Sequence, residues 1–220
     1  MSLPGTRTPL DGRERVQLCA RMEELGPDAP TLCGGWTTFD LAAHLVVRER
    51  NLLGAPGILI AKGPLPGFTA SAMAREKRRG YGAVLDRVRT GPPSGPFAIR
   101  ALREVVNLGE YFVHHEDVRR ANEMTEPRSG IDDVHERLWS VLRRLGKLLF
   151  RAVPADHGVT LVTPGHDPLV LRDRPGSSVR VLGEPGELLL YGYGRRDAAH
   201  VVLEGDDAAI DAVGRARSGV

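Results

Sequence analysis

The stretch Gly109-Glu-Tyr-Phe-Val-His-His-Glu-Asp117 decides how this chain of 220 residues is interpreted, because acids and histidines interrupt an apolar pattern. We expect it to lie in a long helix over 98–121, where residues four apart share a face. Glu110 and His114 then lie on one face, with Asp117 one turn further along. The same face carries the apolar stripe of the helix. A carboxylate there needs an ion-pair partner or a bound cation.

A second polar side chain interrupts another apolar stripe. Thr37 and Asp40 have the spacing of a helix N-cap, and His44 follows between leucines that face the core. With Glu110 and His114, His44 would give two imidazoles and one carboxylate on facing helices. That is a three-ligand metal site with an open position, the arrangement of catalytic zinc.

Simpler interpretations stay open at this point. His44 can be a hydrogen-bonded core histidine, and Glu110 with His114 can be a buried ion pair. Asp117 would either orient His114 or add a further ligand. The neighbouring His115 and Glu116 are expected to be solvated.

Outward from this segment, the first part of the chain reads as helical and the last part as short strands. Apolar spacing predicts helices over 13–25, from Thr37 onward, and over 69–89, 98–121 and 131–150, with a Gly/Pro-rich loop over 54–68. Alternating runs predict strands at 159–162, 169–171, 178–182 and 200–203, and helices at 184–193 and 206–213. The fold class is therefore α+β: a helical bundle over 1–153, followed by a small α+β domain over 154–220.

Composition bounds the class of protein. The chain is 41% hydrophobic and 26% charged, with a formal net charge of +2, values typical of a globular protein and unlike those of a disordered or fibrous one. No signal peptide or membrane-spanning run is visible. Cys19 and Cys33 are expected to be reduced and the protein to be cytoplasmic. Because the charges nearly balance, nucleic acid is not an expected partner. Whether the protein forms a homodimer is left open.

Three motifs resemble those of one family. Cys33-Gly-Gly-Trp-Thr-Thr-Phe-Asp-Leu-Ala-Ala-His-Leu45 resembles the N-terminal signature of the mycothiol-dependent maleylpyruvate isomerase family, within the DinB/YfiT-like bundle superfamily. Glu110-x-x-Val-His-x-x-Asp117 resembles its second signature, and the segment 183–206 its small C-terminal domain. The resemblance is closest to the actinobacterial metal-binding branch of that family.

The resemblance implies a divalent metal, commonly zinc, held by His44, Glu110 and His114. It also implies mycothiol, a low-molecular-weight thiol, as cosubstrate. A metal with an open position favours the thiolate, the nucleophilic form of a thiol. The expected function is a thiol-dependent isomerase or S-transferase acting on a small electrophile. The alternative is a non-catalytic module that binds metal or thiol, with nucleic-acid binding a third and weaker reading.

Other residues have open roles. Arg48, one turn after His44, is expected to meet a substrate carboxylate, or else to be a surface arginine. Arg195 matches a Gly-Arg pair of the family and is expected to act at the site as a catalytic and cofactor-binding residue, or else to be exposed. Cys33 is expected to pack in its loop, with a redox or mixed-disulfide role as the alternative. The basic run 75–79 is expected to be solvated, with an anion site as the alternative.

Overall fold

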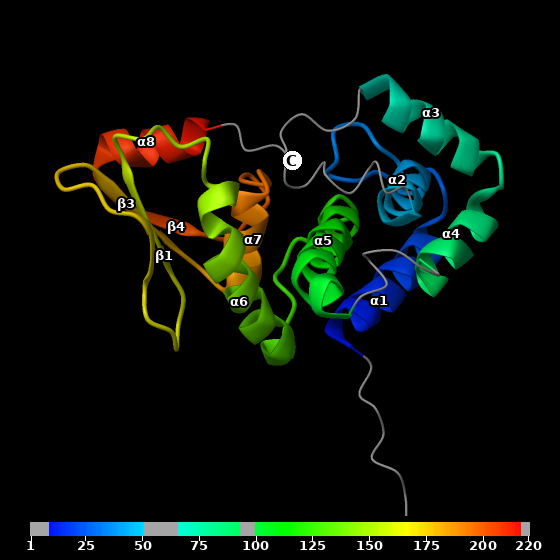
Figure 1. Ribbon diagram of the computed structural model, residues 1–220, viewed down its shortest axis with the longest axis horizontal. Helices are drawn as coiled ribbons and strands as arrows, with labels where there is room; N and C mark the ends of the chain where they lie inside the picture. The colour runs from blue at the N-terminus through cyan, green and yellow to red at the C-terminus, as the bar shows by residue number, and fades with distance from the viewer. Residues whose placement is uncertain (1–8, 51–65, 93–99, 217–220) are drawn as a thin grey trace, which may run out of the picture. The chain divides into compact units, whose positions relative to one another are not determined.

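A computed structural model describes residues 9–50, 66–92 and 100–216, with the backbone alone for 66–68 and 100–106. Contacts divide the chain into two compact units, residues 1–125 and 126–220. The first is helical and the second combines helices with a sheet, which confirms the expected α+β class (Figure 1). No helix among the described residues is both long enough and apolar enough to span a membrane.

The N-terminal unit is a bundle of helices. α1 packs along α5, while α2 contacts both α3 and α4. Its core holds fully buried leucine, methionine and tyrosine side chains, among them Leu18, Met22, Leu45, Leu85 and Tyr111. The helices are α1 (Leu10–Leu25), α2 (Thr38–Arg50), α3 (Pro66–Lys77), α4 (Tyr81–Thr90) and α5 (Arg100–Arg120).

The start of α2 confirms the expected helix N-cap. The Asp40 carboxylate accepts hydrogen bonds from the Thr37 amide at 3.1 Å and from its hydroxyl at 3.0 Å. In return the Asp40 amide donates to the Thr37 hydroxyl at 3.3 Å. This reciprocal capping fixes where α2 begins, and therefore which face of it carries His44.

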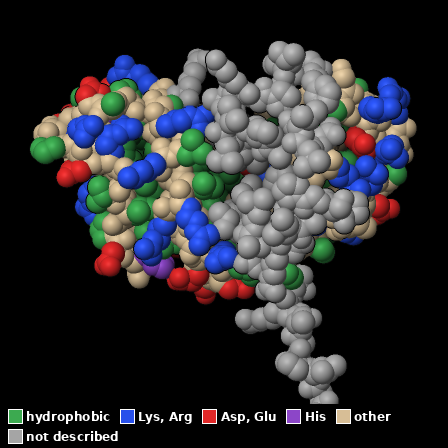
Figure 2. All heavy atoms as spheres, in the orientation of Figure 1, with side chains coloured by type: hydrophobic (Ala, Val, Ile, Leu, Met, Phe, Trp, Pro, Cys, Tyr) green, Lys and Arg blue, Asp and Glu red, His purple; other side chains and the backbone are tan. Residues whose placement is uncertain are grey.

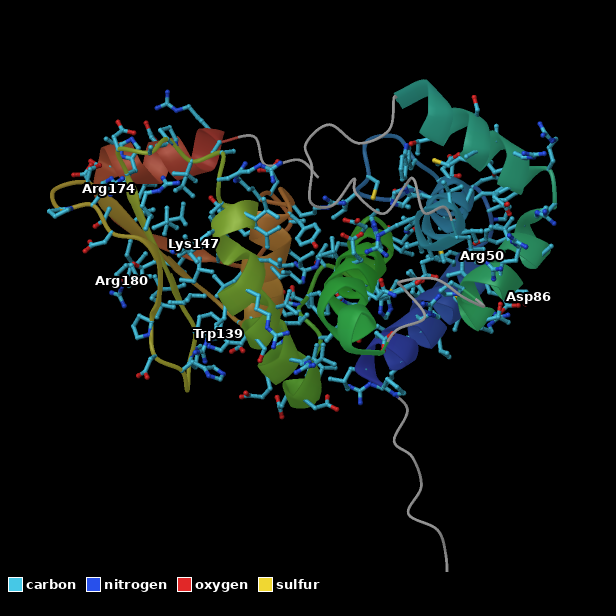
Figure 3. All side chains as sticks on the ribbon, viewed as in Figure 1. Arg50, Asp86, Trp139, Lys147, Arg174 and Arg180 are labelled. Carbon is cyan, nitrogen blue, oxygen red and sulfur yellow. The ribbon has the colours of Figure 1, made fainter. Side chains whose placement is uncertain are left out.

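The prediction of a single basic helix over 69–89 is wrong in one respect, because the structure has two helices there. α3 ends at Lys77 and α4 begins at Tyr81, and between them Gly80 adopts a left-handed φ of 83°. Only glycine takes that conformation without steric cost. Arg50, labelled in Figure 3, extends from the end of α2 to α4, where it donates to the carbonyls of Arg87 at 3.2 Å and Gly91 at 2.6 Å. The expected loop over 54–68 lies mostly outside the described residues.

The C-terminal unit contains a mixed four-stranded sheet in the order β2-β1-β3-β4. β1 pairs with β3 in parallel, and the two outer pairings are antiparallel. Val159 and Leu161 of β1 lie opposite Val179 and Val181 of β3, and all four are buried, so one sheet face packs on the core. The elements are α6 (Asp132–Leu149), β1 (Gly158–Val162), β2 (Leu169–Arg172), β3 (Ser178–Leu182), α7 (Pro185–Gly192), β4 (Val202–Gly205) and α8 (Asp207–Arg215).

The structure groups α6 with the strands, whereas the sequence placed the division after it, at 153/154. The reason is close packing. A Cβ on Gly146 of α6 would lie 2.7 Å from the Leu171 side chain of β2, and one on Gly192 of α7 would lie 3.0 Å from Phe150. Small residues here let α6 approach its neighbours closely. On the face drawn in Figure 2, Lys and Arg side chains of this unit are spread among other residues rather than gathered in one patch.

Candidate metal centre

One face of α5 carries three buried polar side chains in the N-terminal unit. Glu110, His114 and Asp117 are 5%, 8% and 0% exposed. Their spacing along the helix puts them on neighbouring positions of the same face, as the sequence predicted. Their burial means that each must be paired with other groups of the protein or with a ligand.

The two ring nitrogens of His114 face different carboxylates. Nδ1 lies 3.0 Å from Asp117 Oδ2, and Nε2 lies 3.6 Å from Glu110 Oε2. Burial alone would lower the pKa of His114, but its contacts with Asp117, Cys33 and Glu110 hold the pKa well above the usual value. A protonated ring can donate at both nitrogens, whereas a neutral ring leaves one nitrogen free to bind a cation.

His44 of α2 joins this group, as expected. Its ring centroid lies 5.6 Å from that of His114, in an edge-to-face arrangement. On its other side lies Trp36, at 5.0 Å between centroids. Trp36 is half-buried and packs against the bundle core, so it holds the first turns of α2 and the His44 ring in place.

Cys33 also lies in the cluster, where the sequence had suggested mainly a loop-packing role. Its thiol donates to Asp117 Oδ2 at 3.0 Å, and Sγ lies 3.7 Å from His114 Nδ1. The donor atoms of Cys33, His114 and Asp117 all lie within 4.8 Å of one another, a group that could hold a metal ion. The sequence signal was available, since Cys33 stands three residues before Trp36 in the first motif.

The loop that carries Cys33 is tied to α5. The Leu32 amide donates to the Asp117 carbonyl at 3.1 Å. Within the loop, the Cys33 amide donates to the Thr31 hydroxyl at 3.2 Å, and the Trp36 amide donates to the Cys33 carbonyl at 3.0 Å. These bonds fix the thiol over Asp117, although the two residues are far apart in sequence.

Arg48 supplies positive charge beside Glu110. Its Nε lies 3.3 Å from Glu110 Oε2, and its Nη1 donates to Asn107 at 3.1 Å. Burial alone would raise the pKa of Glu110, but Arg48 and the two histidines hold it at about 2. Glu110 is therefore a carboxylate at neutral pH. Arg48 is 4% exposed, so it is not the surface arginine of the alternative interpretation.

A polar chain continues from Arg48 through the bundle. Asn107 donates to Glu49 at 3.1 Å, and Glu49 receives two hydrogen bonds from Arg15 of α1, at 2.7 and 2.5 Å. Arg15 also donates to the Val88 carbonyl at 2.7 Å and lies over the Tyr111 ring at 4.4 Å. The chain links α1, α2, α4 and α5 beneath the candidate centre.

The expectation that His115 and Glu116 are solvated is wrong, since they are 6% and 1% exposed. His115 Nδ1 lies 3.2 Å from Glu14 of α1. Glu116 accepts from Arg119 at 2.8 Å and from Arg120 at 2.7 Å. α5 packs on more than one side, so its polar residues away from the candidate centre are buried in ion pairs.

The basic run 75–79 is mostly exposed, and its Lys77 and Arg79 pair with acids. Arg79 and Arg87 both lie 3.1 Å from Glu76 Oε2, and Lys77 lies 2.7 Å from Asp40. These pairs support the solvated reading of the run. In these ion pairs the acids neutralise positive charge that would otherwise be available to bind an anion.

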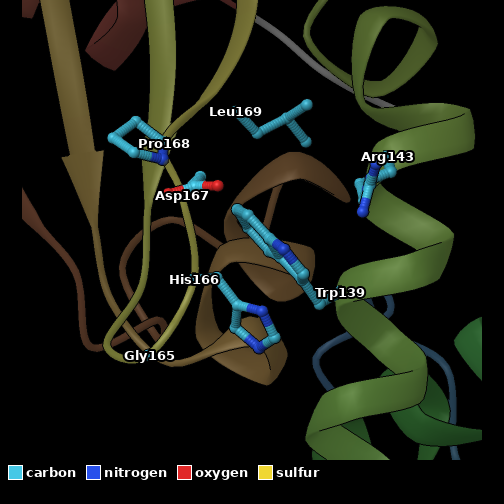
Figure 4. A pocket seen from close by; sticks show the side chains of 7 residues that line it. All are labelled: Trp139, Arg143, Gly165, His166, Asp167, Pro168 and Leu169. Carbon is cyan, nitrogen blue, oxygen red and sulfur yellow. The ribbon is translucent and has the colours of Figure 1, made fainter.

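The C-terminal unit has a hollow of its own, of about 560 Å³, between α6 and the turn after β1 (Figure 4). The Trp139 and His166 rings stack there at 5.4 Å. Arg195 belongs to this unit, where it donates to the Tyr193 carbonyl at 2.8 Å. Its expected role at the candidate centre stays a prediction.

Two sets of residues offer donor types that suit a divalent cation, and among the described residues the group whose donor atoms lie within 4.8 Å of one another is Cys33, His114 and Asp117. His44, Glu110 and His114 Nε2 offer two imidazoles and a carboxylate, and Asp117 would hold a proton on Nδ1 of His114. A carboxylate on the far nitrogen is the usual support of a histidine ligand. Alternatively, Nδ1 of His114, Asp117 and Cys33 offer nitrogen, oxygen and sulfur donors.

Together, these features define a helical-bundle protein with a buried cluster of histidine, carboxylate and thiol groups that could hold a metal ion. The family model for the mycothiol maleylpyruvate isomerase N-terminal domain matches residues 12–175. The chain belongs to that family. No curated protein and no solved structure matches the chain.

Proposed function

We propose that the protein is a metal- and mycothiol-dependent isomerase or S-transferase acting on a small electrophile. Family membership supports the thiol and the reaction class. The observation that carries the proposal is the orientation of His114, with Asp117 at one ring nitrogen, Glu110 on the side of the other, and the His44 ring 5.6 Å away between centroids. A buried acid beside two imidazoles suits a divalent cation, and zinc is the metal we expect.

The protein side chains have separate tasks in this proposal. His44 and His114 bind as neutral imidazoles and Glu110 as a carboxylate, while Asp117 keeps the proton of His114 on Nδ1. A bound divalent cation would supply positive charge that favours the thiolate form of the cosubstrate. The half-buried positions of Cys33 and His44 leave this end of the cluster partly accessible.

The chemistry follows from the thiolate. Its sulfur adds to one carbon of an activated double bond, and the bonding electrons move to the activating group. The former double bond can then rotate. Elimination of the same thiolate restores the double bond with the other geometry, so the thiol is not consumed. Attack at a centre that carries a leaving group gives S-transfer instead.

Arg48 is proposed to contact an acidic group of the substrate. Its present partner is Glu110. Once Glu110 binds a cation, its negative charge is shared, and the guanidinium can pair with a substrate carboxylate, for which its geometry is well suited. Neither Cys19 nor Cys33 is in a disulfide bond, which fits the proposed cytoplasmic location.

Metal content and turnover test the proposal together. Elemental analysis should find about one divalent ion per wild-type chain and a large loss in His44→Ala, Glu110→Gln and His114→Ala. His200→Ala is a matched control, because His200 is exposed and lies in the other unit. Wild type should convert an electrophile only with mycothiol present. Equal metal in wild type and Glu110→Gln would overturn the ligand set, and bound metal without thiol-dependent turnover would favour the non-catalytic module.

A further inference from the structure

We propose that Cys33, Asp117 and Nδ1 of His114 form a second site, for a single thiophilic cation such as Cd²⁺ or Zn²⁺, on the opposite side of the His114 ring from Glu110. The inference does not rest on the proposed function. It rests on three donors of different chemistry that converge from the loop before α2 and from α5.

The distances within the group suit an ion. Sγ to Oδ2 and Nδ1 to Oδ2 are each 3.0 Å, and Sγ to Nδ1 is 3.7 Å. Zinc bonds are about 2.0–2.3 Å long, so neighbouring ligands in a tetrahedral site lie roughly 3.3–3.6 Å apart. Shifts of a few tenths of an ångström would therefore open the triangle enough for an ion.

The chain holds these donors in place before any ion binds. Asp117 and His114 lie one turn apart on α5, and the Leu32 amide bonds the Asp117 carbonyl. After Cys33 the chain turns sharply through Gly34 and Gly35, with φ of 46° and 83°. Only glycine adopts these values at no cost, and Cys33, which precedes this turn, is partly exposed. An ion can reach the thiol from the exposed side.

The sulfur decides which cation binds. Thiolate is a soft ligand that favours Cd²⁺, Zn²⁺ and Cu⁺ over Mg²⁺ or Ca²⁺. Binding displaces the thiol proton that now points at Asp117 and also the Nδ1 proton of the His114 ring, whose contacts hold its pKa well above the usual value, so two protons leave to solvent as one ion enters. The ring of His114 must then carry its proton on Nε2, facing Glu110.

The two proposed sites therefore use opposite tautomers of His114. An ion on Nδ1 needs the proton on Nε2, and an ion on Nε2 needs it on Nδ1. Since one neutral ring cannot serve both, occupation of one site weakens the other. Without an ion, Cys33, His114 and Asp117 already bond to one another. The alternative to a metal site is therefore a purely structural group, and the experiment below distinguishes the two.

Cadmium titration of the full chain is the test, with the ultraviolet sulfur-to-cadmium charge-transfer absorption as the readout. Wild type should develop this band to a plateau at about one equivalent of Cd²⁺. Cys33→Ser should abolish the band, while Cys19→Ala, which removes the other thiol, should keep it. Asp117→Asn should weaken the Cd²⁺ affinity by roughly tenfold or more.

Glu110→Gln separates this site from that of the proposed function. The variant removes a ligand of the other set only, so its cadmium band should remain and its affinity should not fall. Circular dichroism checks that each variant is folded. A folded wild type with no band, a band that survives in Cys33→Ser, or a band lost in Glu110→Gln would overturn the proposal. If the cadmium results are as expected but His44→Ala keeps its full metal content, the Cys33, His114 and Asp117 site would be supported and the ligand set of the proposed function would not.

Discussion

Arg48 and Glu110 form a buried ion pair, with Nε and Oε2 3.3 Å apart and both side chains almost fully removed from solvent. Neither charge would be tolerated there alone, because desolvation of an unpaired ion costs several kcal/mol. The pair joins the candidate metal centre to the polar chain beneath it. Arg48 is thus the residue through which the stability of the bundle and the chemistry of the centre are coupled.

Replacement of Arg48 should separate these two effects. Arg48→Gln leaves Glu110 without its cation, so the metal-free variant should lose about 3–5 kcal/mol of unfolding free energy. The same variant should bind Zn²⁺ more tightly, by roughly tenfold, since a nearby like charge is gone. Urea denaturation with and without Zn²⁺ measures both. Weaker Zn²⁺ binding in the folded variant would contradict the placement of the cation beside Glu110.

The Arg15–Glu49 pair offers a prediction that involves no metal. Arg15→Met leaves the Glu49 carboxylate buried with one fewer charged partner, and should cost about 3–5 kcal/mol. Arg15→Met combined with Glu49→Leu should recover most of that loss, because no unpaired charge remains. Urea denaturation of the two single variants and the double variant gives the coupling energy. Additive losses would show that the pair contributes little as a pair.

The turn after α5 holds a residue in an unfavourable conformation. Glu123 has a left-handed φ of 66°, and the Met124 amide donates to the Arg119 carbonyl at 3.2 Å, the pattern of a helix end that usually carries glycine. Glu123→Gly should therefore raise stability by about 0.5–1 kcal/mol. Glu126→Gly, at an exposed position nearby, is the control and should not stabilise. Thermal unfolding of both variants distinguishes relief of strain from loss of an acidic side chain.

Much of the architecture could be read from local patterns. The apolar repeat of α6 and the Thr37–Asp40 cap both predicted helices close to their observed positions. The break at Gly80 was missed, because the charged stretch around it has little apolar periodicity to interrupt. A polar surface helix and two shorter ones have nearly the same sequence pattern.

The candidate centre was predictable only in part. Glu110, His114 and Asp117 share a helix face, so their grouping follows from spacing alone. Cys33 and Asp117 are 84 residues apart in the sequence, and their contact depends on how the loop before α2 folds back onto α5. Similarly, the burial of His115 depends on a partner in α1, Glu14. Contacts of this kind have no periodic signature in the sequence.

The two cysteines should differ strongly in reactivity. Cys19 is fully buried in the bundle core, and burial raises the pKa of its thiol to about 11, whereas Cys33 is half-exposed. At about pH 8 only on the order of one Cys19 in a thousand is the thiolate, which is the form that reacts. Folded wild type should thus react with one equivalent of a disulfide reagent per chain, through Cys33, and denatured wild type with two.

Cys33→Ser isolates the response of Cys19. The folded variant should be nearly inert at about pH 8, and its rate should rise roughly tenfold per pH unit toward the raised pKa, because the thiolate fraction rises in that proportion. Measurement of the rate against pH, with circular dichroism as a check on folding, tests both points. Rapid reaction of folded Cys33→Ser at about pH 8 would mean that Cys19 is reached through opening of the bundle, and that burial does not protect it.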